Sequence, residues 1–245
     1  MPVAISVRNL NKVFYINDKS TDTLSGWFNE IITPKKKLKK LHVIKNLNFD
    51  IEKGETFGII GRNGSGKSTL VKLMSGVYIP DNGSIVKKNG SSMLMNLKVG
   101  ASPELTARQN IYVIGSSLGL KIKDIDKKFD EIMDFNELHE FVDTKVRNFS
   151  NGMMARLSFS IAVHAGADII FLDEIFAVGD KKFKDKAIKE FEKNWLKGKT
   201  TVMVSHTLSN MKKYCDRVLY LKNGEIAFLG DPKKAIKMYE DDNAT

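Results

Sequence analysis

The sequence predicts an α/β fold built on a mostly parallel sheet, and three short apolar runs carry that prediction. The runs are residues 57–60, 169–172 and 202–204. Continuous apolar runs of this length are typical of strands buried on both faces of a parallel sheet, with helices in the connections. Polar residues follow each run, and α/β sheets bind their ligands at the carboxyl ends of strands. The functional residues are therefore expected directly after these runs.

Three further patterns belong to the predicted core. Residues 47–51 alternate apolar and polar, as in a strand with one buried face. Asn223-Gly224 separates two apolar runs, which is a strong signal for a β-hairpin. Asp231-Pro232 predicts the start of a last short helix, because Asp caps helices and Pro suits the first helical position.

The residue pattern of the sequence changes between about residues 100 and 150. This stretch has helical spacing rich in Lys, Asp and Glu, and it contains no buried-strand run. We therefore expect a helical subdomain inserted into the α/β core. The predicted division is one domain over residues 1–245, with the core at 1–98 and 157–245 and the helical part at about 99–156.

Composition limits the classes of function. The single cysteine, Cys215, forms no internal disulfide and is expected to be a small core residue in a reducing compartment. The net charge of +10 would suit a nucleic-acid partner, but only six of the 39 basic residues are Arg, the residue best suited to reading bases. We expect a solvated lysine surface and no nucleic acid. No signal peptide and no membrane span are expected, because apolar stretches are short.

Residues 61–69, with the sequence GRNGSGKST, match the phosphate-binding pattern G-x-x-x-x-G-K-[ST]. The motif follows a predicted strand and precedes an apolar helical pattern. The alternative, a glycine-rich turn that binds no ligand, would not require this strand–loop–helix context. Its glycines allow backbone N–H groups to surround a phosphate, and the helix adds its positive end. Lys67 would reach the β- and γ-phosphates of ATP, and Ser68 would bind Mg²⁺. The predicted ATP-binding residues are Gly61, Arg62, Asn63, Gly64, Ser65, Gly66, Lys67, Ser68 and Thr69.

Asp173 and Glu174 directly follow the apolar run at 169–172. An Asp in this position can hold Mg²⁺, and the adjacent Glu can polarise the attacking water. An acidic pair at a strand end is more often a helix cap when it stands alone. With the phosphate loop upstream, the pair predicts a hydrolytic site in which Ser68 and Asp173 are metal ligands and Glu174 is the base.

Three more segments indicate which kind of ATPase this is. Residues 149–153, FSNGM, resemble the signature loop of ABC ATPases, and residues 177–180, AVGD, resemble their D-loop. His206 resembles their switch histidine. The order of all these segments resembles that of the ABC ATPase family over most of the chain.

Details of these segments resemble one branch of that family, the exporters of O-antigen, capsular polysaccharide and teichoic acid. Residues 149–157 look like their YSSGM-x-x-RL signature, and AVGD is a form of their D-loop. Residues 104–111 resemble their ELTGREN segment. A long insertion between the first strands is also present here, at about residues 17–41.

The resemblance implies a RecA-like P-loop NTPase core with an N-terminal antiparallel β part and an ABC helical subdomain. It implies a homodimer that binds two ATP molecules, each between the P-loop of one subunit and the signature loop of the other. The residues that would contact ATP across this interface are Ser150, Asn151, Gly152 and Met153, beside the D-loop residue Asp180. His206 would hold the γ-phosphate.

The implied function is ATP hydrolysis that powers export of a lipid-linked polysaccharide through a separate ABC-2 type permease. The chain would be peripheral, at the cytoplasmic face of the membrane. The alternatives are the ATPase of another exporter, for drugs, lipids or proteins, and a soluble ABC protein that acts on nucleic acid.

The chain departs from the family pattern in two places. The glutamine of the Q-loop has no clear counterpart, because the only Gln is Gln109, which comes late in the sequence. Asn96 is the candidate for that position. The aromatic residue that stacks on adenine is Phe14 or Tyr15 by position, with His42 as an alternative after the insertion.

The insertion itself predicts an amphipathic helix that meets the membrane surface or the permease. Its apolar residues share one helical face and precede a run of lysines. They are Leu24, Trp27, Phe28, Ile31 and Ile32. The alternative is that this helix packs only on its own core.

Overall fold

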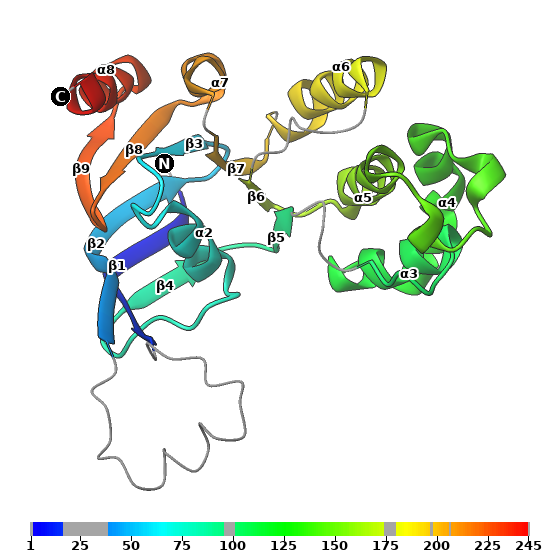
Figure 1. Ribbon diagram of the computed structural model, residues 1–245, viewed down its shortest axis with the longest axis horizontal. Coiled ribbons are helices and arrows are strands. Elements are labelled where there is room, and N and C mark those ends of the chain that lie inside the picture. Colours follow the sequence, from blue (N-terminus) through cyan, green and yellow to red (C-terminus); the bar gives the residue numbers. More distant parts are fainter. Residues whose placement is uncertain are drawn as a thin grey trace, which may run out of the picture.

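The computed structural model describes residues 2–16, 39–95, 101–173, 180–196, 198–205 and 207–244. Two sheets lie side by side, and a group of helices projects beyond one edge of the larger sheet (Figure 1). The smaller sheet has the order β2-β1-β4, from Lys39–Glu52, Val3–Ile16 and Ile85–Lys88. The larger has the order β5-β6-β7-β3-β8-β9. Its strands are Ser92–Met95, Ile169–Asp173, Thr200–Val204, Thr56–Ile60, Arg217–Lys222 and Glu225–Gly230.

The three apolar runs form neighbouring parallel strands in the middle of the larger sheet. They are β3, β6 and β7, and β7 lies between the other two. Every residue of β3 and β7 is buried, which explains why these strands read as continuous apolar runs. The predicted α/β fold is therefore confirmed.

The predicted hairpin is the antiparallel pair β8–β9 at the edge of this sheet. Asn223 and Gly224 both have positive φ, at 52° and 82°, as a two-residue hairpin turn with the twist of the strands requires. The strand predicted at 47–51 lies within β2, and its Leu47, Phe49 and Ile51 face the core. Its partner β1 is antiparallel, so the expected N-terminal antiparallel part is present.

The helices are α2 to α8 in the labels of Figure 1. Their bounds are Lys67–Ser75, Ala107–Ser117, Ile122–Asn136, Asn151–Ala165, Lys181–Glu190, Leu208–Tyr214 and Pro232–Ala244. Short 3₁₀ turns follow α4 at His139–Phe141 and Val146–Asn148, and a π-helical turn, Phe191–Trp195, extends α6. Asp231 caps α8 as predicted, since its Oδ1 accepts a hydrogen bond from the Lys234 amide at 3.0 Å. None of the helices in the described ranges combines the length and apolarity needed to span a bilayer.

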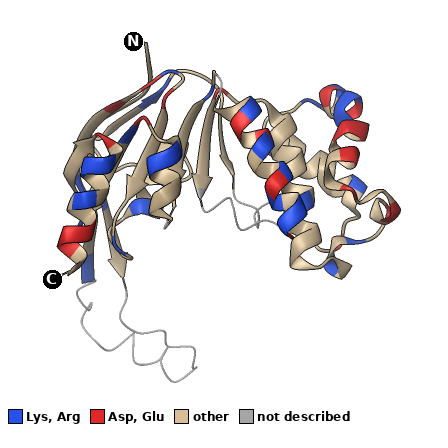
Figure 2. Cartoon of the chain, turned by 90° about the horizontal axis from the view of Figure 1, so that it is seen from above, with Lys and Arg blue, Asp and Glu red and all other residues tan. Residues whose placement is uncertain are grey.

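Helix α5 belongs to two hydrophobic clusters and so joins the helical group to the sheet. Its Leu157 and Ile161 pack with α3 and α4, whereas its Phe159 and Ala162 pack with the larger sheet and α6. The boundary proposed between residues 156 and 157 therefore falls inside one continuous helix. Basic side chains are spread over helices of both parts and are interspersed with acidic ones (Figure 2).

The predicted amphipathic helix lies outside the described residues, which omit 17–38. The last residues assigned to the insertion, Lys39 to Leu41, begin strand β2.

Candidate functional site

The phosphate-binding motif connects β3 to α2. Lys67 is the first residue of α2 and is only 7% exposed. Its Nζ donates to the carbonyl oxygens of Gly61, at 2.7 Å, and Arg62, at 3.0 Å. The Lys67 ammonium therefore lies against the start of the loop. The backbone amides at the start of α2 come directly after the loop.

Two glycines permit the close approach of this loop to neighbouring strands. Gly66 has φ 106°, and a Cβ there would lie 2.9 Å from Ile44 Cδ1 and 3.0 Å from the Val43 oxygen. A Cβ on Gly61 would lie 2.3 Å from the Leu221 oxygen. Side chains are excluded at both positions, so the loop stays pressed against β2 and β8.

The start of α2 offers an electrostatic environment for an anion. Gly66 supplies no side-chain cap, and the first turn carries no acidic residue. The amides at this end keep their partial positive charge, which favours a bound phosphate. The Ser68 side chain is exposed here, and the buried Ser65 Oγ has no hydrogen-bond partner among the described residues.

The β8–β9 hairpin supports the loop from the other side, a contribution that the sequence analysis did not identify. The Gly224 amide donates to the Ser65 carbonyl at 3.1 Å, and the Gly224 carbonyl accepts from the Lys45 amide at 2.9 Å. A polar cleft of about 330 Å³ opens between loop and hairpin. It is lined by Arg62, Asn63, Gly64, Ser65, Tyr220, Leu221, Lys222 and Asn223. The Asn-Gly turn signal was present in the sequence, but nothing in it indicates this contact.

Asp173 ends β6 at the same edge of the sheet as the P-loop. Ile59 on β3 is the register partner of Val204 on β7, and Val204 is the partner of Asp173. Adjacent strands are about 4.8 Å apart, which places the Asp173 Cα about 10 Å from that of Ile59. The P-loop begins two residues after Ile59, so the backbone brings the two predicted halves of the site together.

Three predicted site residues follow this edge but lie outside the described residues. Glu174 comes directly after β6, and His206 comes two residues after the end of β7. Asn96 comes directly after β5, whose Met95 is the register partner of Leu172. Their roles stay predictions.

The candidates for adenine stacking lie on opposite faces of the smaller sheet. Phe14 pairs with Leu41 and contacts Tyr78 edge-on, at 5.7 Å between ring centroids. Tyr15 pairs with Lys40 on the other face and is 65% exposed. His42 shares the face of Tyr15, since it pairs with Val13, and its Nε2 lies 3.1 Å from Asn11 Oδ1. Phe14 therefore faces the side on which the chain leaving α2 packs.

The predicted signature residues form the start of α5. Ser150 is the N-cap, and its Oγ accepts from the Met153 amide at 3.2 Å. Ser150 and Asn151 are exposed, Gly152 is half-buried, and the first turn carries no acidic residue. Figure 1 places α5 beyond β5, away from α2. A single chain thus presents two separate helix N-termini that suit anions, and it does not bring them together.

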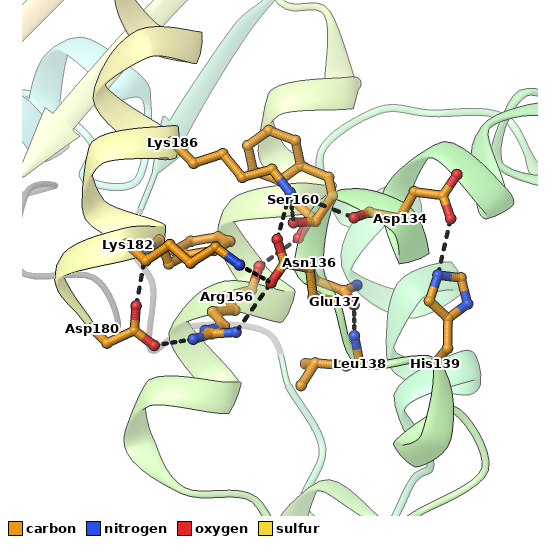
Figure 3. A network of polar contacts seen from close by, with 12 residues as sticks. Asp134, Asn136, Glu137, Leu138, His139, Arg156, Ser160, Asp180, Lys182 and Lys186 are labelled. Carbon is orange, nitrogen blue, oxygen red and sulfur yellow. Dashed lines mark hydrogen bonds and ion pairs between the residues drawn. The ribbon is translucent and has the colours of Figure 1, made fainter.

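Asp180, the predicted D-loop residue, caps α6. Its Oδ1 accepts from the Phe183 amide at 2.9 Å, and its Oδ2 accepts from the guanidinium of Arg156 on α5 (Figure 3). These hydrogen bonds, the one from Phe183 first, hold the pKa of Asp180 below its ordinary value. The rest of the predicted D-loop, residues 177–179, is outside the described ranges.

The proposed metal ligands provide the donor type that Mg²⁺ prefers. Ser68 offers a hydroxyl at the first turn of α2, and Asp173 is a carboxylate residue at the end of β6, at the same edge of the sheet. Mg²⁺ at nucleotide sites is commonly held by one or two protein oxygens together with substrate phosphates. The residues present therefore fit this ion.

Comparison with known proteins identifies a family. Residues 44–177 match the family model described as ABC transporter. A teichoic acids export ATP-binding protein, TagH, of Listeria innocua is 34% identical over 98% of this chain and 70% of its own length. An O-antigen export system ATP-binding protein, RfbB, of Klebsiella pneumoniae is 38% identical over 82% of each chain. RfbB of Myxococcus xanthus is 39% identical over 81% of this chain and 45% of its own.

Solved structures support the same fold at lower identity. The ATP-binding subunit of an ABC transporter superposes with a TM-score of 0.74 at 18% identity, over 97% of this chain and 93% of the other. A dimeric post-hydrolysis state of the ATP-binding cassette MJ0796, bound to ADP and Pi, gives 0.71 at 21% identity, over 93% and 98%. The predicted P-loop core with an ABC helical part is therefore confirmed as a fold.

Proposed function

Because the chain belongs to the ABC transporter family, we propose that it is the ATP-hydrolysing subunit of an exporter of lipid-linked polysaccharide. The observation that carries the hydrolytic part is the strand register that places Asp173 at the same sheet edge as the P-loop. The names of the relatives, which are ATP-binding proteins of teichoic acid and O-antigen export, support the transported class.

The roles of the site residues follow from their positions. The loop amides and Lys67 bind the β- and γ-phosphates of ATP, and Phe14 stacks on adenine. Ser68 and Asp173 would hold Mg²⁺, which neutralises phosphate charge when bound. Glu174 orients the attacking water and accepts its proton, and His206 donates to the γ-phosphate. Asn96 takes the place of the Q-loop glutamine.

Two copies of the chain are needed to complete each site. The start of α5 suits a phosphate but lies away from α2 within one chain. In a homodimer, Ser150, Asn151, Gly152 and Met153 of one copy contact the nucleotide on the P-loop of the other. Binding of ATP then favours the closed dimer, because the nucleotide supplies contacts to both copies.

The other partners are permease subunits in the membrane. The chain works at the cytoplasmic face of the membrane as a peripheral subunit, and the predicted helix over residues 24–32 meets the permease or the lipid surface. The permease carries the polysaccharide, and ATP-driven closure of the dimer supplies the work.

The test is the Glu174→Gln variant of the full chain. It should bind ATP with wild-type affinity and hydrolyse it at least about a hundredfold more slowly, since a positioned base contributes 10²–10⁴ in rate. With Mg-ATP the variant should elute as a dimer in gel filtration, and the dimer should weaken when Ser150→Ala is added. Glu192→Gln, which removes a carboxylate paired with Lys213 on α7, is the control and should hydrolyse normally. A wild-type rate in Glu174→Gln would refute the assignment of the base.

A further inference from the structure

Helix α4 ends at a residue that is conformationally unusual. Glu137 is its C-cap and has left-handed backbone angles, φ 59° and ψ 36°. Its amide donates to the Met133 carbonyl at 3.0 Å, as in the common left-handed helix ending. Glycine is the usual residue at such a position, because a Cβ disfavours this conformation. The presence of a glutamate at this position indicates that contacts of its side chain compensate for the unfavourable backbone conformation.

The Glu137 carboxylate lies among three cations from two other helices (Figure 3). Lys186 Nζ is 3.1 Å from Oε1, and Lys182 Nζ and Arg156 Nη1 are 3.8 Å and 4.0 Å from Oε2. These groups, Lys186 first, hold the pKa of Glu137 below its ordinary value. We call this set the charged hub, and it consists of Glu137, Arg156, Asp180, Lys182 and Lys186.

Lys186 ties α6 to the end of α4 in a second way. Its Nζ donates to the Phe135 carbonyl at 2.9 Å, and it lies 4.6 Å from the centre of the Phe135 ring. A cation at the carbonyl end of a helix is favourable, because that end carries partial negative charge. The same ring meets Phe183 of α6 edge-on at 5.8 Å, so the hub covers an aromatic contact between α4 and α6.

Arg156 carries the connection to the start of α6. Its guanidinium donates to Asp180 and lies 5.2 Å from the centre of the Phe183 ring. Arg156 is on α5, the helix whose N-cap is Ser150, and Asp180 is the N-cap of α6. The hub therefore joins the helix that carries the predicted signature serine to the residue that closes the predicted D-loop.

We propose that Glu137 is a positioning residue for ATP hydrolysis, which holds α5 and the start of α6 in one relative arrangement. The proposal rests on the proposed function. Without the carboxylate, Arg156, Lys182 and Lys186 would lie close together with less compensating charge, and their repulsion would separate α5 from α6. The step that needs Ser150 and Asp180 in register, closure of the dimer over ATP, would slow. Binding of ATP to the P-loop, which the hub does not touch, would not change.

The test separates the side chain of Glu137 from its role in ending α4. Glu137→Gly keeps the left-handed cap, since glycine favours it, and removes the carboxylate. In this full-length variant we expect kcat for ATP hydrolysis to fall about fivefold. A decrease of this size is expected when a few partly exposed ion pairs, each of which contributes little, are lost together. The dissociation constant of ATP, measured by equilibrium titration at a protein concentration too low for dimer formation, should not change. The melting temperature should stay within about 4 °C of wild type.

A matched pair of variants controls for loss of an exposed carboxylate. Glu137 and Glu192 have similar side-chain exposure, 41% and 39%, and each pairs with a lysine of another helix. Glu137→Gln should lower kcat, whereas Glu192→Gln should not. A purely structural role for Glu137 would instead move the melting temperature and leave kcat per folded molecule unchanged.

A double-mutant cycle tests whether Glu137 acts through Asp180. Asp180→Asn keeps a good N-cap but removes the charge that Arg156 binds. If one network carries the effect, the double variant with Glu137→Gly should be no slower than the slower single variant, because coupled residues are not additive. The proposal would be overturned if the two single variants lowered kcat additively, or if kcat of Glu137→Gly stayed within twofold of wild type. In either case the proposed function would stand, provided that the wild-type protein hydrolyses ATP. A wild type that hydrolyses no ATP would overturn both.

Discussion

Burial decides the chemistry of the one cysteine. Cys215 follows α7 and is 9% exposed, with its Sγ 3.6 Å from Met211 Sδ. The room for this sulfur comes from Gly58 on β3, where a Cβ would lie only 2.8 Å from Sγ. Loss of hydration is the first cause that raises the pKa of the thiol to about 12. Cys215 is therefore a small core residue, as the sequence predicted.

The native thiol should therefore be inert to an alkylating reagent at pH 8. With a pKa of about 12, only about one thiol in ten thousand is ionised at that pH, and the thiolate is the nucleophile. Labelling followed by mass spectrometry should be at least about a hundredfold slower in the folded protein than in urea, where one thiol per chain reacts. Rapid stoichiometric labelling of the folded chain would contradict the buried placement.

Capping defines the beginning of α3 and also explains the only glutamine. Thr106 Oγ1 accepts from the Gln109 amide at 3.2 Å, and Gln109 Oε1 accepts from the Thr106 amide at 3.0 Å. This reciprocal pair satisfies two amides that the helix would otherwise leave unpaired. Gln109 is therefore a capping residue in the helical group. This role agrees with the expectation that Gln109 comes too late in the sequence to be the Q-loop glutamine.

Thr106→Ala should lower the free energy of unfolding by about 1 kcal/mol, because a lost N-cap typically has that cost. Urea denaturation of the full chain measures it. Thr207→Ala is the matched control, since Thr207 is the N-cap of α7 but its side chain makes no capping hydrogen bond. Its stability should change by less than about half of that amount. Equal losses in both variants would argue against a specific role for the α3 cap.

The start of α2 and the start of α5 lie in different parts of the molecule, and the charged hub lies on the side of α5. The sheet edge carries the P-loop and Asp173, whereas α5 presents Ser150 on the helical group beyond β5 (Figure 1). Packing of α5 against both clusters makes the helical group continuous with the sheet.

Export should depend on the predicted amphipathic helix even where soluble ATPase activity does not. Replacing Trp27 and Phe28 with Ala removes the two largest apolar side chains of its predicted face. We expect the purified variant to keep its ATPase rate and melting temperature and to impair polymer export in cells. Normal export would refute the role, and unfolding of the isolated variant would favour packing on the chain's own core.

The amino-acid sequence by itself determined the features that rest on local rules. Continuous apolar runs specified β3, β6 and β7, Asn223-Gly224 specified the hairpin, and Asp231-Pro232 specified the start of α8. The spacing of glycines and Lys67 specified the P-loop. Each of these depends on neighbours within a few residues, so a short window contains the whole signal.

Only the tertiary structure decided which of these segments meet. The sequence does not state that β7 lies between β3 and β6, and this order is what aligns Asp173 with the P-loop. Strands β4 and β5 are four residues each and have no continuous buried run, so they exist through pairing with β1 and β6. The charged hub joins residues 19 to 49 positions apart, from Glu137–Arg156 to Glu137–Lys186. Such contacts carry no local signal, because they form only when the packing of whole helices brings the charges together.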